Sequence, residues 1–113
     1  GQGFTLNGLK KYVPDGHYAD VFIVAARTFG EAGDRHGISL FLVPKGAKGV
    51  TVTPLKTVDS HGAAHVSFDG VHVADTALIG PADEGADILD PVLERAAIGM
   101  AAEMLGSAQA AFD

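Results

Sequence analysis

The feature that most limits how this chain can fold is a segment near its C-terminus that is apolar around almost its whole circumference. Apolar side chains recur there at the spacing of an α-helix: Ile88, Leu89, Val92, Leu93, Ala96, Ala97, Met100, Ala101, Met104, Leu105, Ala108 and Phe112. Small residues (Gly99, Ala102, Gly106) occupy the opposite side. The pattern predicts one long helix, which begins near Ala86 with a kink at Pro91, or at Pro91 with Asp90 as its N-cap.

A helix of this kind must be buried on several sides, and glycine in its interior indicates that another backbone approaches closely. Its charged residues between Pro91 and Phe112 are Glu94, Arg95 and Glu103, which argues against a membrane span. One small β unit covers only one side of such a helix. Since the chain also begins without Met, we expect it to be a piece of a larger polypeptide whose further helices or subunits supply the missing contacts.

Residues 1–80 are divided by turn residues into short apolar runs, which is typical of closely spaced strands. The predicted fold class is mainly β: a small antiparallel β-barrel or sandwich of about six or more strands, followed by one long α-helix. Asn7-Gly8 predicts a tight hairpin between residues 4–6 and 9–13, and Asp69-Gly70 predicts a hairpin or a bulge. The unbroken apolar run 20–27 predicts a central strand buried on both faces.

Charge and composition exclude several classes of partner. The 8 Lys and Arg residues against 14 Asp and Glu residues give a net charge of −6, and no basic stripe is present for nucleic acid or an anionic membrane. The absence of cysteine removes disulfides and thiolate metal sites, and it fits a cytoplasmic location. If His61 and His65 lie on one extended strand, they stand about 13 Å apart, too far to share a metal ion.

Carboxylates are the remaining candidates for chemistry. Asp83, Glu84 and Asp87 precede or open the helix, where they stabilise its positive end. Glu94 differs because it lies in a segment whose surroundings should be dry. A carboxylate in such a place is either a reactive base or the partner of a cation, here Arg95, and the residues alone favour the ion pair.

Six pieces of the chain, read in order, resemble the acyl-CoA dehydrogenase family. They are Leu6-Asn7-Gly8-Leu9-Lys10, Ala19-Asp20 with Val24-Ala25-Ala26-Arg27, residues 37–43, Gly49-Val50, residues 66–71 and Leu105-Gly106-Ser107-Ala108. The resemblance implies that residues 1–85 are the middle β domain of that family and that residues 86–113 open its C-terminal helical domain. It also implies FAD as cofactor, oxidation of an acyl-CoA thioester across its α and β carbons, an electron-transferring flavoprotein as acceptor, and a homo- or hetero-oligomer.

The resemblance further implies which residues form a wall of the flavin site: Tyr12, Val13, Pro14 and Asp15. Tyr12 fits the aromatic place of the family's pattern. Pro14 stands where the family commonly has threonine, and it offers neither a hydroxyl nor an N–H. The run 58–61 and Ala74 also depart from the family's usual residues, so the chain looks like a divergent member.

Leu93-Glu94-Arg95 is similar to a motif in which some members carry their catalytic base, so the resemblance implies Glu94 as a candidate base. The family's usual glutamate lies farther downstream, outside these residues. Two functions therefore stay open: a flavin-dependent acyl-CoA dehydrogenase, and a catalytically silent subunit of the same fold in a mixed oligomer. The long apolar helix argues against a third function, an unrelated β-barrel binding module, because such a module would be complete without that helix.

Overall fold

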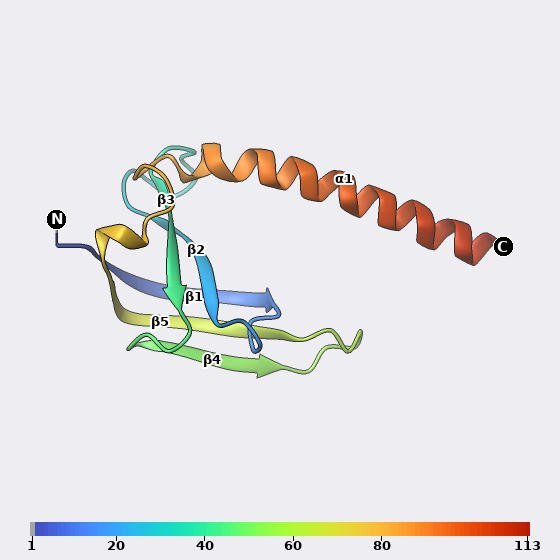
Figure 1. The fold of residues 1–113 in the computed structure, drawn as a ribbon, viewed down its shortest axis with the longest axis horizontal. Coiled ribbons are helices and arrows are strands. Elements are labelled where there is room, and N and C mark those ends of the chain that lie inside the picture. Colours follow the sequence, from blue (N-terminus) through green and yellow to red (C-terminus); the bar gives the residue numbers. More distant parts are fainter. Residues whose placement is uncertain (1) are drawn as a thin grey trace.

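The computed structural model describes residues 2–113. Along the chain, the elements are β1 (Phe4–Pro14), β2 (Val21–Arg27), β3 (Ile38–Pro44), β4 (Val50–Leu55), β5 (Ala63–Val73), a 3₁₀ turn η1 (Asp75–Ala77) and α1 (Gly85–Phe112). Figure 1 shows the strands gathered into one body from which α1 extends. The predicted mainly-β class with one long C-terminal helix is confirmed.

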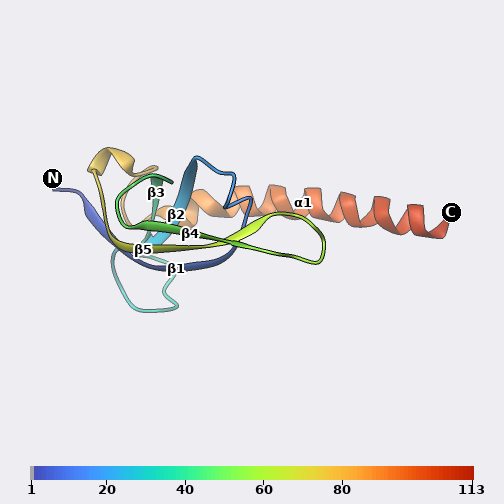
Figure 2. The same ribbon diagram turned by 90° about the horizontal axis from the view of Figure 1, so that it is seen from below.

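The strands form two antiparallel sheets that pack face to face. One sheet has the order β1-β5-β4, and the other consists of β2 and β3. In Figures 1 and 2, β2 and β3 run across the strands of the first sheet, so the two layers enclose the core between them. β5 is hydrogen-bonded to a neighbour on each side, which makes it the central strand of its sheet.

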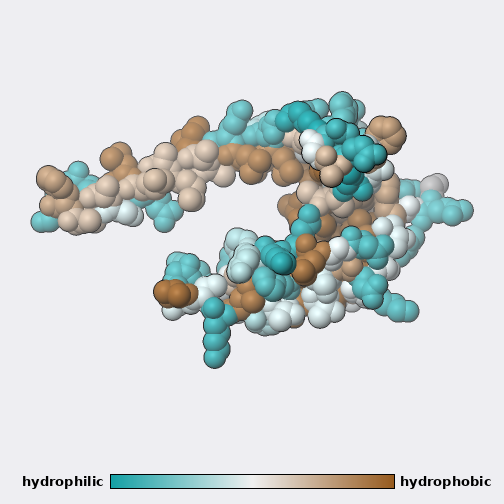
Figure 3. All heavy atoms as spheres, turned by 180° about the vertical axis from the view of Figure 1, so that it is seen from behind, coloured by the Kyte–Doolittle hydropathy of each residue, from teal (hydrophilic) through white to brown (hydrophobic). Residues whose placement is uncertain are grey.

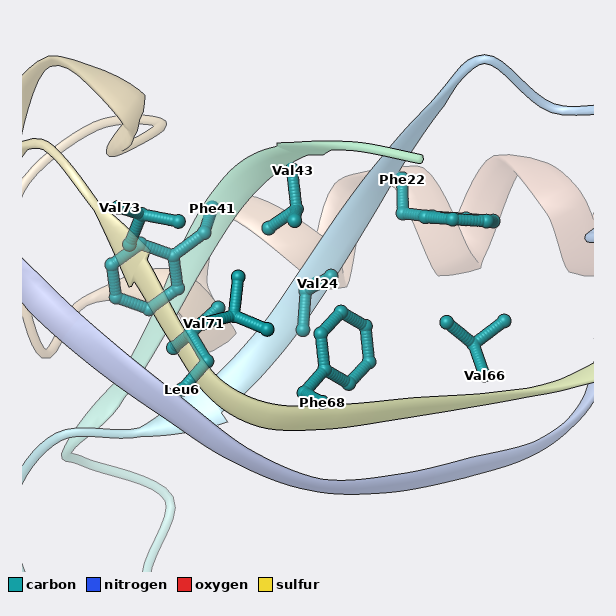
Figure 4. Packing of buried hydrophobic residues seen from close by; sticks show 9 residues of the cluster. All are labelled: Leu6, Phe22, Val24, Phe41, Val43, Val66, Phe68, Val71 and Val73. Atoms are coloured by element: carbon teal, nitrogen blue, oxygen red, sulfur yellow. The ribbon is translucent and has the colours of Figure 1, made fainter. Parts of the chain in front are cut away.

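The core is a single cluster of apolar side chains between the two sheets. Figure 4 shows its nine buried members: Leu6, Phe22, Val24, Phe41, Val43, Val66, Phe68, Val71 and Val73. Phe4 adds an edge-to-face contact with Phe41, with 5.1 Å between ring centroids. Complete burial of one such side chain stabilises a fold by about 1.5–3 kcal/mol. β5 supplies four of the nine, so this strand links the core to both of its neighbours.

The hairpin predicted at Asn7-Gly8 is wrong, because β1 runs through this point as one strand. Asn7 lies opposite Asp69-Gly70 in a β-bulge where the pairing of β1 with β5 shifts register. The Asn7 side chain accepts a hydrogen bond from the Gly70 N–H at 2.7 Å. Asn7-Gly8 and Asp69-Gly70 thus mark the two strands of one bulge. Because the chain reverses at neither of them, residues 2–113 form five strands.

The prediction that residues 20–27 form a central strand buried on both faces is also wrong. β2 has only β3 as a partner, and its burial alternates: Phe22 and Val24 are in the core, whereas Val21 and Ile23 are exposed. Ile23 keeps 67% of its surface accessible. The run is apolar on both faces, but this chain covers only the inner one.

The helix α1 begins at Gly85, so the earlier of the two expected starts holds and Pro91 lies inside the helix. Its side chains from Pro91 onward are exposed. Figure 3 shows apolar side chains along α1 bordering an open space between the helix and the strands. Within residues 2–113, no helix is both long and apolar enough to cross a membrane.

We expect Gly49→Ala to destabilise the fold strongly, because Gly49 has φ +92° and a Cβ there would lie 2.2 Å from the Asp69 carbonyl oxygen of the backbone. The backbone conformation alone would cost roughly 1–3 kcal/mol. Urea unfolding measures the loss, with Gly46→Ala as the matched control, since Gly46 is in the same turn with open space around it. Equal stability of the two variants would contradict the close approach of β4 and β5 at Gly49.

Candidate functional site

Residues 12–15, implied by the resemblance to form a binding wall, lie at the C-terminal end of β1 and in the turn that follows. The Tyr12 side chain points away from the core and is 69% exposed. Val13 turns inward and packs against the core, whereas Pro14 and Asp15 are exposed. The segment therefore presents an aromatic ring to the outside on an anchored backbone.

This backbone is held in an uncommon conformation. A second bulge interrupts the pairing of β1 with β5 between Lys10 and Val13, and both Tyr12 and Asp15 adopt left-handed conformations with φ +53° and +56°. Bulges of this kind re-aim a side chain, and non-glycine residues adopt positive φ at a cost that the surrounding structure must offset. The bulge therefore takes Tyr12 out of the regular β1–β5 ladder.

The main-chain donors of the segment are largely occupied by the protein itself. The Tyr12 N–H donates to His65 Nδ1 at 3.2 Å, and the Asp15 N–H donates to the Gly62 carbonyl at 2.8 Å. Pro14 has no N–H. A ligand at this wall would therefore meet the face of the Tyr12 ring, and it would find no donor on the backbone of these three residues.

A shallow depression of about 410 Å³ adjoins the wall, between the turn after β1 and the loop before β5. Its lining includes His17, Tyr18, Lys56 and His61. The His17 ring lies against the Tyr18 ring, with 4.0 Å between ring centroids and 44° between planes, and it occupies the space that a side chain at Gly62 would need. No motif of the sequence marks this cluster, because it joins residues about 40 positions apart.

The loop before β5 is ordered by its own hydrogen bonds. Thr57 donates its hydroxyl to the His61 carbonyl, and the His61 N–H donates to the Asp59 carboxylate at 3.1 Å. The Thr57 hydroxyl and the His61 N–H hold the pKa of the Asp59 carboxyl below its usual value. His61 therefore belongs to the loop, whereas His65 lies in β5. Among residues 2–113, no group of three or more His, Cys, Asp or Glu side chains is arranged to hold a metal ion.

A larger cleft, about 530 Å³, lies elsewhere on the strands. It is lined by residues 5–10 of β1, residues 24–27 of β2, Ile38 and Phe68. It opens where the edges of the two sheets face each other without being hydrogen-bonded. Residues 12–15 do not line this cleft, so the predicted wall and the larger concave surface are separate features.

The helix that carries Glu94 is joined to the strands by a cluster of polar groups. Thr28 donates its hydroxyl to the Asp83 carboxylate and lies 2.6 Å from the fully buried Ser39 hydroxyl. Ser39 accepts the Asp83 N–H at 2.8 Å, and the Asp83 carbonyl accepts the Gly37 N–H at 3.0 Å. These bonds hold Asp83 at φ +68°, the point where the chain turns into α1.

An ion-pair network adds to this junction on the outside. Arg35 contacts Asp87 at 2.8 Å and Asp90 at 2.6 Å, and its hydrogen bonds to Asp90 and Asp87 raise the pKa of the guanidinium. All three side chains are well exposed, so the pairs contribute little to stability and mainly orient the start of α1. Of the three carboxylates predicted to be structural, Asp83 bonds to Thr28 and Asp87 to Arg35, both in the loop 28–37, whereas the Glu84 side chain forms no cap hydrogen bond with α1.

The structure does not bring Glu94 close to residues 12–15. Glu94 lies on the exposed part of α1, and it forms no ion pair or hydrogen bond with Arg95 in the part of the chain that is described. Open space separates this part of the helix from the strands (Figure 3). The dry surroundings expected for Glu94 are therefore not formed by residues 2–113.

Comparison with known proteins gives a consistent result. The family model described as "Acyl-CoA dehydrogenase, middle domain" matches residues 1–71. An acyl-CoA dehydrogenase of Bacillus subtilis (strain 168) is 35% identical over 113 residues, which cover 97% of this chain. The same alignment covers 30% of the Bacillus protein, so the chain spans about a third of that relative's length or less.

Two solved structures resemble the fold. The FAD complex of PigA superposes with a TM-score of 0.73 and 30% identity, and the match covers 78% of this chain and 24% of PigA. The ChsE4-ChsE5 complex of Mycobacterium tuberculosis gives a TM-score of 0.73 and 26% identity over 83% of this chain and 24% of the matched one. Both similarities extend over most of the two-sheet body and are strong enough to indicate a common fold.

We expect Ser39→Ala to loosen the junction between the strands and α1. The change leaves the Asp83 N–H and the Thr28 hydroxyl without their buried partner, which costs about 1–3 kcal/mol. Amide hydrogen exchange should rise at Asp83 and Gly85, and urea unfolding should shift to lower denaturant. Ser107→Ala, on the exposed part of α1, is the control and should leave both measurements within experimental error.

Proposed function

The chain belongs to the acyl-CoA dehydrogenase family, and from this premise we propose that it forms one wall of an FAD site in an enzyme that oxidises acyl-CoA thioesters at the α and β carbons. In this proposal residues 1–85 are the middle β domain and residues 86–113 are the first helix of the C-terminal helical domain. Further helical segments would cover the exposed apolar side chains of α1 and of the outer face of β2.

The observation that carries the proposal is the exposed Tyr12 ring on an anchored backbone at the end of β1. An isoalloxazine ring is flat and aromatic, and it packs well on such a surface. Since the N–H groups of Tyr12 and Asp15 are already bonded and Pro14 has none, the wall fits the flavin through ring contact, without main-chain hydrogen bonds from these residues. When bound, FAD supplies the hydride acceptor for the oxidation.

Glu94 is the proposed catalytic base for the α proton of the thioester. It lies on α1 beyond the junction, so its distance from the wall depends on the direction that the Asp83 cluster and Arg35 give to the helix. Covering helices would remove water from this face and increase the basicity of the carboxylate. An electron-transferring flavoprotein as acceptor and a cytoplasmic location complete the proposal.

The second candidate function is a catalytically silent subunit that completes a mixed oligomer. Pro14 favours it, because a wall with no N–H at this position suits a subunit whose partner holds the flavin. The ChsE4-ChsE5 structure is a complex of two proteins, which supports this kind of assembly as a precedent. Purification of the intact protein distinguishes the two functions: a yellow protein bleached by an acyl-CoA supports the enzyme, and a colourless one supports the silent subunit.

We expect Tyr12→Ala to weaken FAD binding by the intact protein about tenfold, because the loss of an aromatic contact costs roughly 0.5–1.5 kcal/mol beyond its buried area. Fluorescence titration of the apoprotein with FAD measures the affinity. Tyr18→Ala is the matched control, since Tyr18 is 77% exposed in the next turn and outside the wall. Equal affinity in the two variants would remove Tyr12 from the flavin site.

We expect Glu94→Gln to slow flavin reduction by an acyl-CoA by roughly 10²- to 10⁴-fold, the usual contribution of general-base catalysis. The substitution keeps the shape of the side chain and removes its basicity. Stopped-flow absorbance of the flavin measures the rate, and Glu103→Gln on the same helix is the control. A rate within about tenfold of the unmodified protein would show that another residue is the base.

A further inference from the structure

The Tyr12 backbone adopts a conformation that its own residue type does not favour. Its φ of +53° lies in the left-handed region, where a non-glycine residue costs of order 1–3 kcal/mol and persists only when neighbouring groups hold it. Tyr12 lies in the bulge where β1 and β5 are out of register, so the regular ladder does not hold it. Some other contact must fix its direction.

That contact is supplied by His65, which lies on β5 opposite the bulge, between the pairs Lys10–Val66 and Val13–Ala64. The imidazole Nδ1 accepts the Tyr12 N–H at 3.2 Å, in place of the carbonyl that a regular strand would offer. The same ring meets the Tyr12 ring edge to face, with 5.1 Å between centroids and 82° between planes. One half-buried side chain therefore binds both the backbone and the ring of Tyr12.

We propose that His65 is a positioning residue for the aromatic wall: its unprotonated Nδ1 and its ring hold Tyr12 in the exposed, left-handed conformation that presents the phenol ring to the flavin. The inference rests on the proposed function for the identity of the ligand. The hydrogen bond itself does not depend on the ligand. It requires the tautomer with the proton on Nε2, because a protonated Nδ1 has no lone pair to accept the Tyr12 N–H.

The chemistry of the bond indicates which replacements preserve it. Asparagine places its carbonyl oxygen near the position of Nδ1 and so keeps an acceptor for the Tyr12 N–H. Valine suits a strand but has no acceptor. His72→Val is the matched control, because His72 is on the same strand, is exposed and lies opposite Thr5, away from the bulge.

The first experiment measures the hydrogen bond in the protein without flavin. Labelling only tyrosine and histidine with ¹⁵N simplifies the spectrum, because these 113 residues hold two tyrosines and five histidines. We expect a scalar coupling across the hydrogen bond between the Tyr12 amide nitrogen and His65 Nδ1, and fast exchange of the Tyr12 amide in His65→Val but not in His72→Val. Absence of the coupling, or slow exchange in His65→Val, would overturn the proposal.

The second experiment measures FAD affinity and the visible flavin spectrum of the intact protein. We expect His65→Val to weaken binding about fivefold, the equivalent of one net hydrogen bond, and His65→Asn to restore most of the loss. Unchanged affinity in His65→Val, or equal loss in the Asn and Val variants, would overturn the positioning role. If Tyr12→Ala leaves FAD binding unchanged, the proposed wall fails, whereas the coupling experiment still decides whether His65 holds Tyr12.

Discussion

The structure depends on the antiparallel pairing of β1 with β5. β5 lies between β1 and β4, contributes Val66, Phe68, Val71 and Val73 to the core, and is therefore the strand through which both halves of the first sheet are fixed. Two bulges interrupt its pairing with β1. Each bulge is held by a side chain that takes over a main-chain hydrogen bond: Asn7 accepts from Gly70, and His65 accepts from Tyr12. The pairing thus tolerates irregularity because polar side chains replace the lost ladder bonds.

Much of the fold could be predicted from local patterns, since strand runs and helical periodicity are encoded within a few residues. The predicted hairpin failed because Asn-Gly and Asp-Gly specify positive φ, and a bulge uses that freedom as well as a hairpin does. The prediction that β2 is buried on both faces failed for another reason. Its apolar run shows that both faces can be buried, but which face this chain covers depends on the packing of the second sheet.

The candidate site was predictable only in part. The resemblance implies a wall at residues 12–15, which stays a prediction, and the structure shows that the Tyr12 ring in this segment is exposed. His65 and Gly62, which bind the main chain of the wall, are separated from it by about 50 residues, so no local motif can identify them. The same holds for the junction of Thr28, Ser39 and Asp83. Contacts between distant polar residues become visible only when the topology brings the strands together.

The wall and the helix are positioned by different physical means. At the wall, the fold itself uses the main-chain donors of Tyr12 and Asp15, which leaves an aromatic face as the surface that remains for recognition. At the helix, the polar groups around Asp83 are satisfied inside the protein, whereas the apolar side chains of α1 beyond Pro91 stay exposed. Burying those side chains would then be the main source of binding energy for whatever covers the helix, since area removed from water contributes about 25 cal/mol per Å². Such contact is non-directional, so the direction of α1 must come from the hydrogen-bonded junction, which is already complete in this chain.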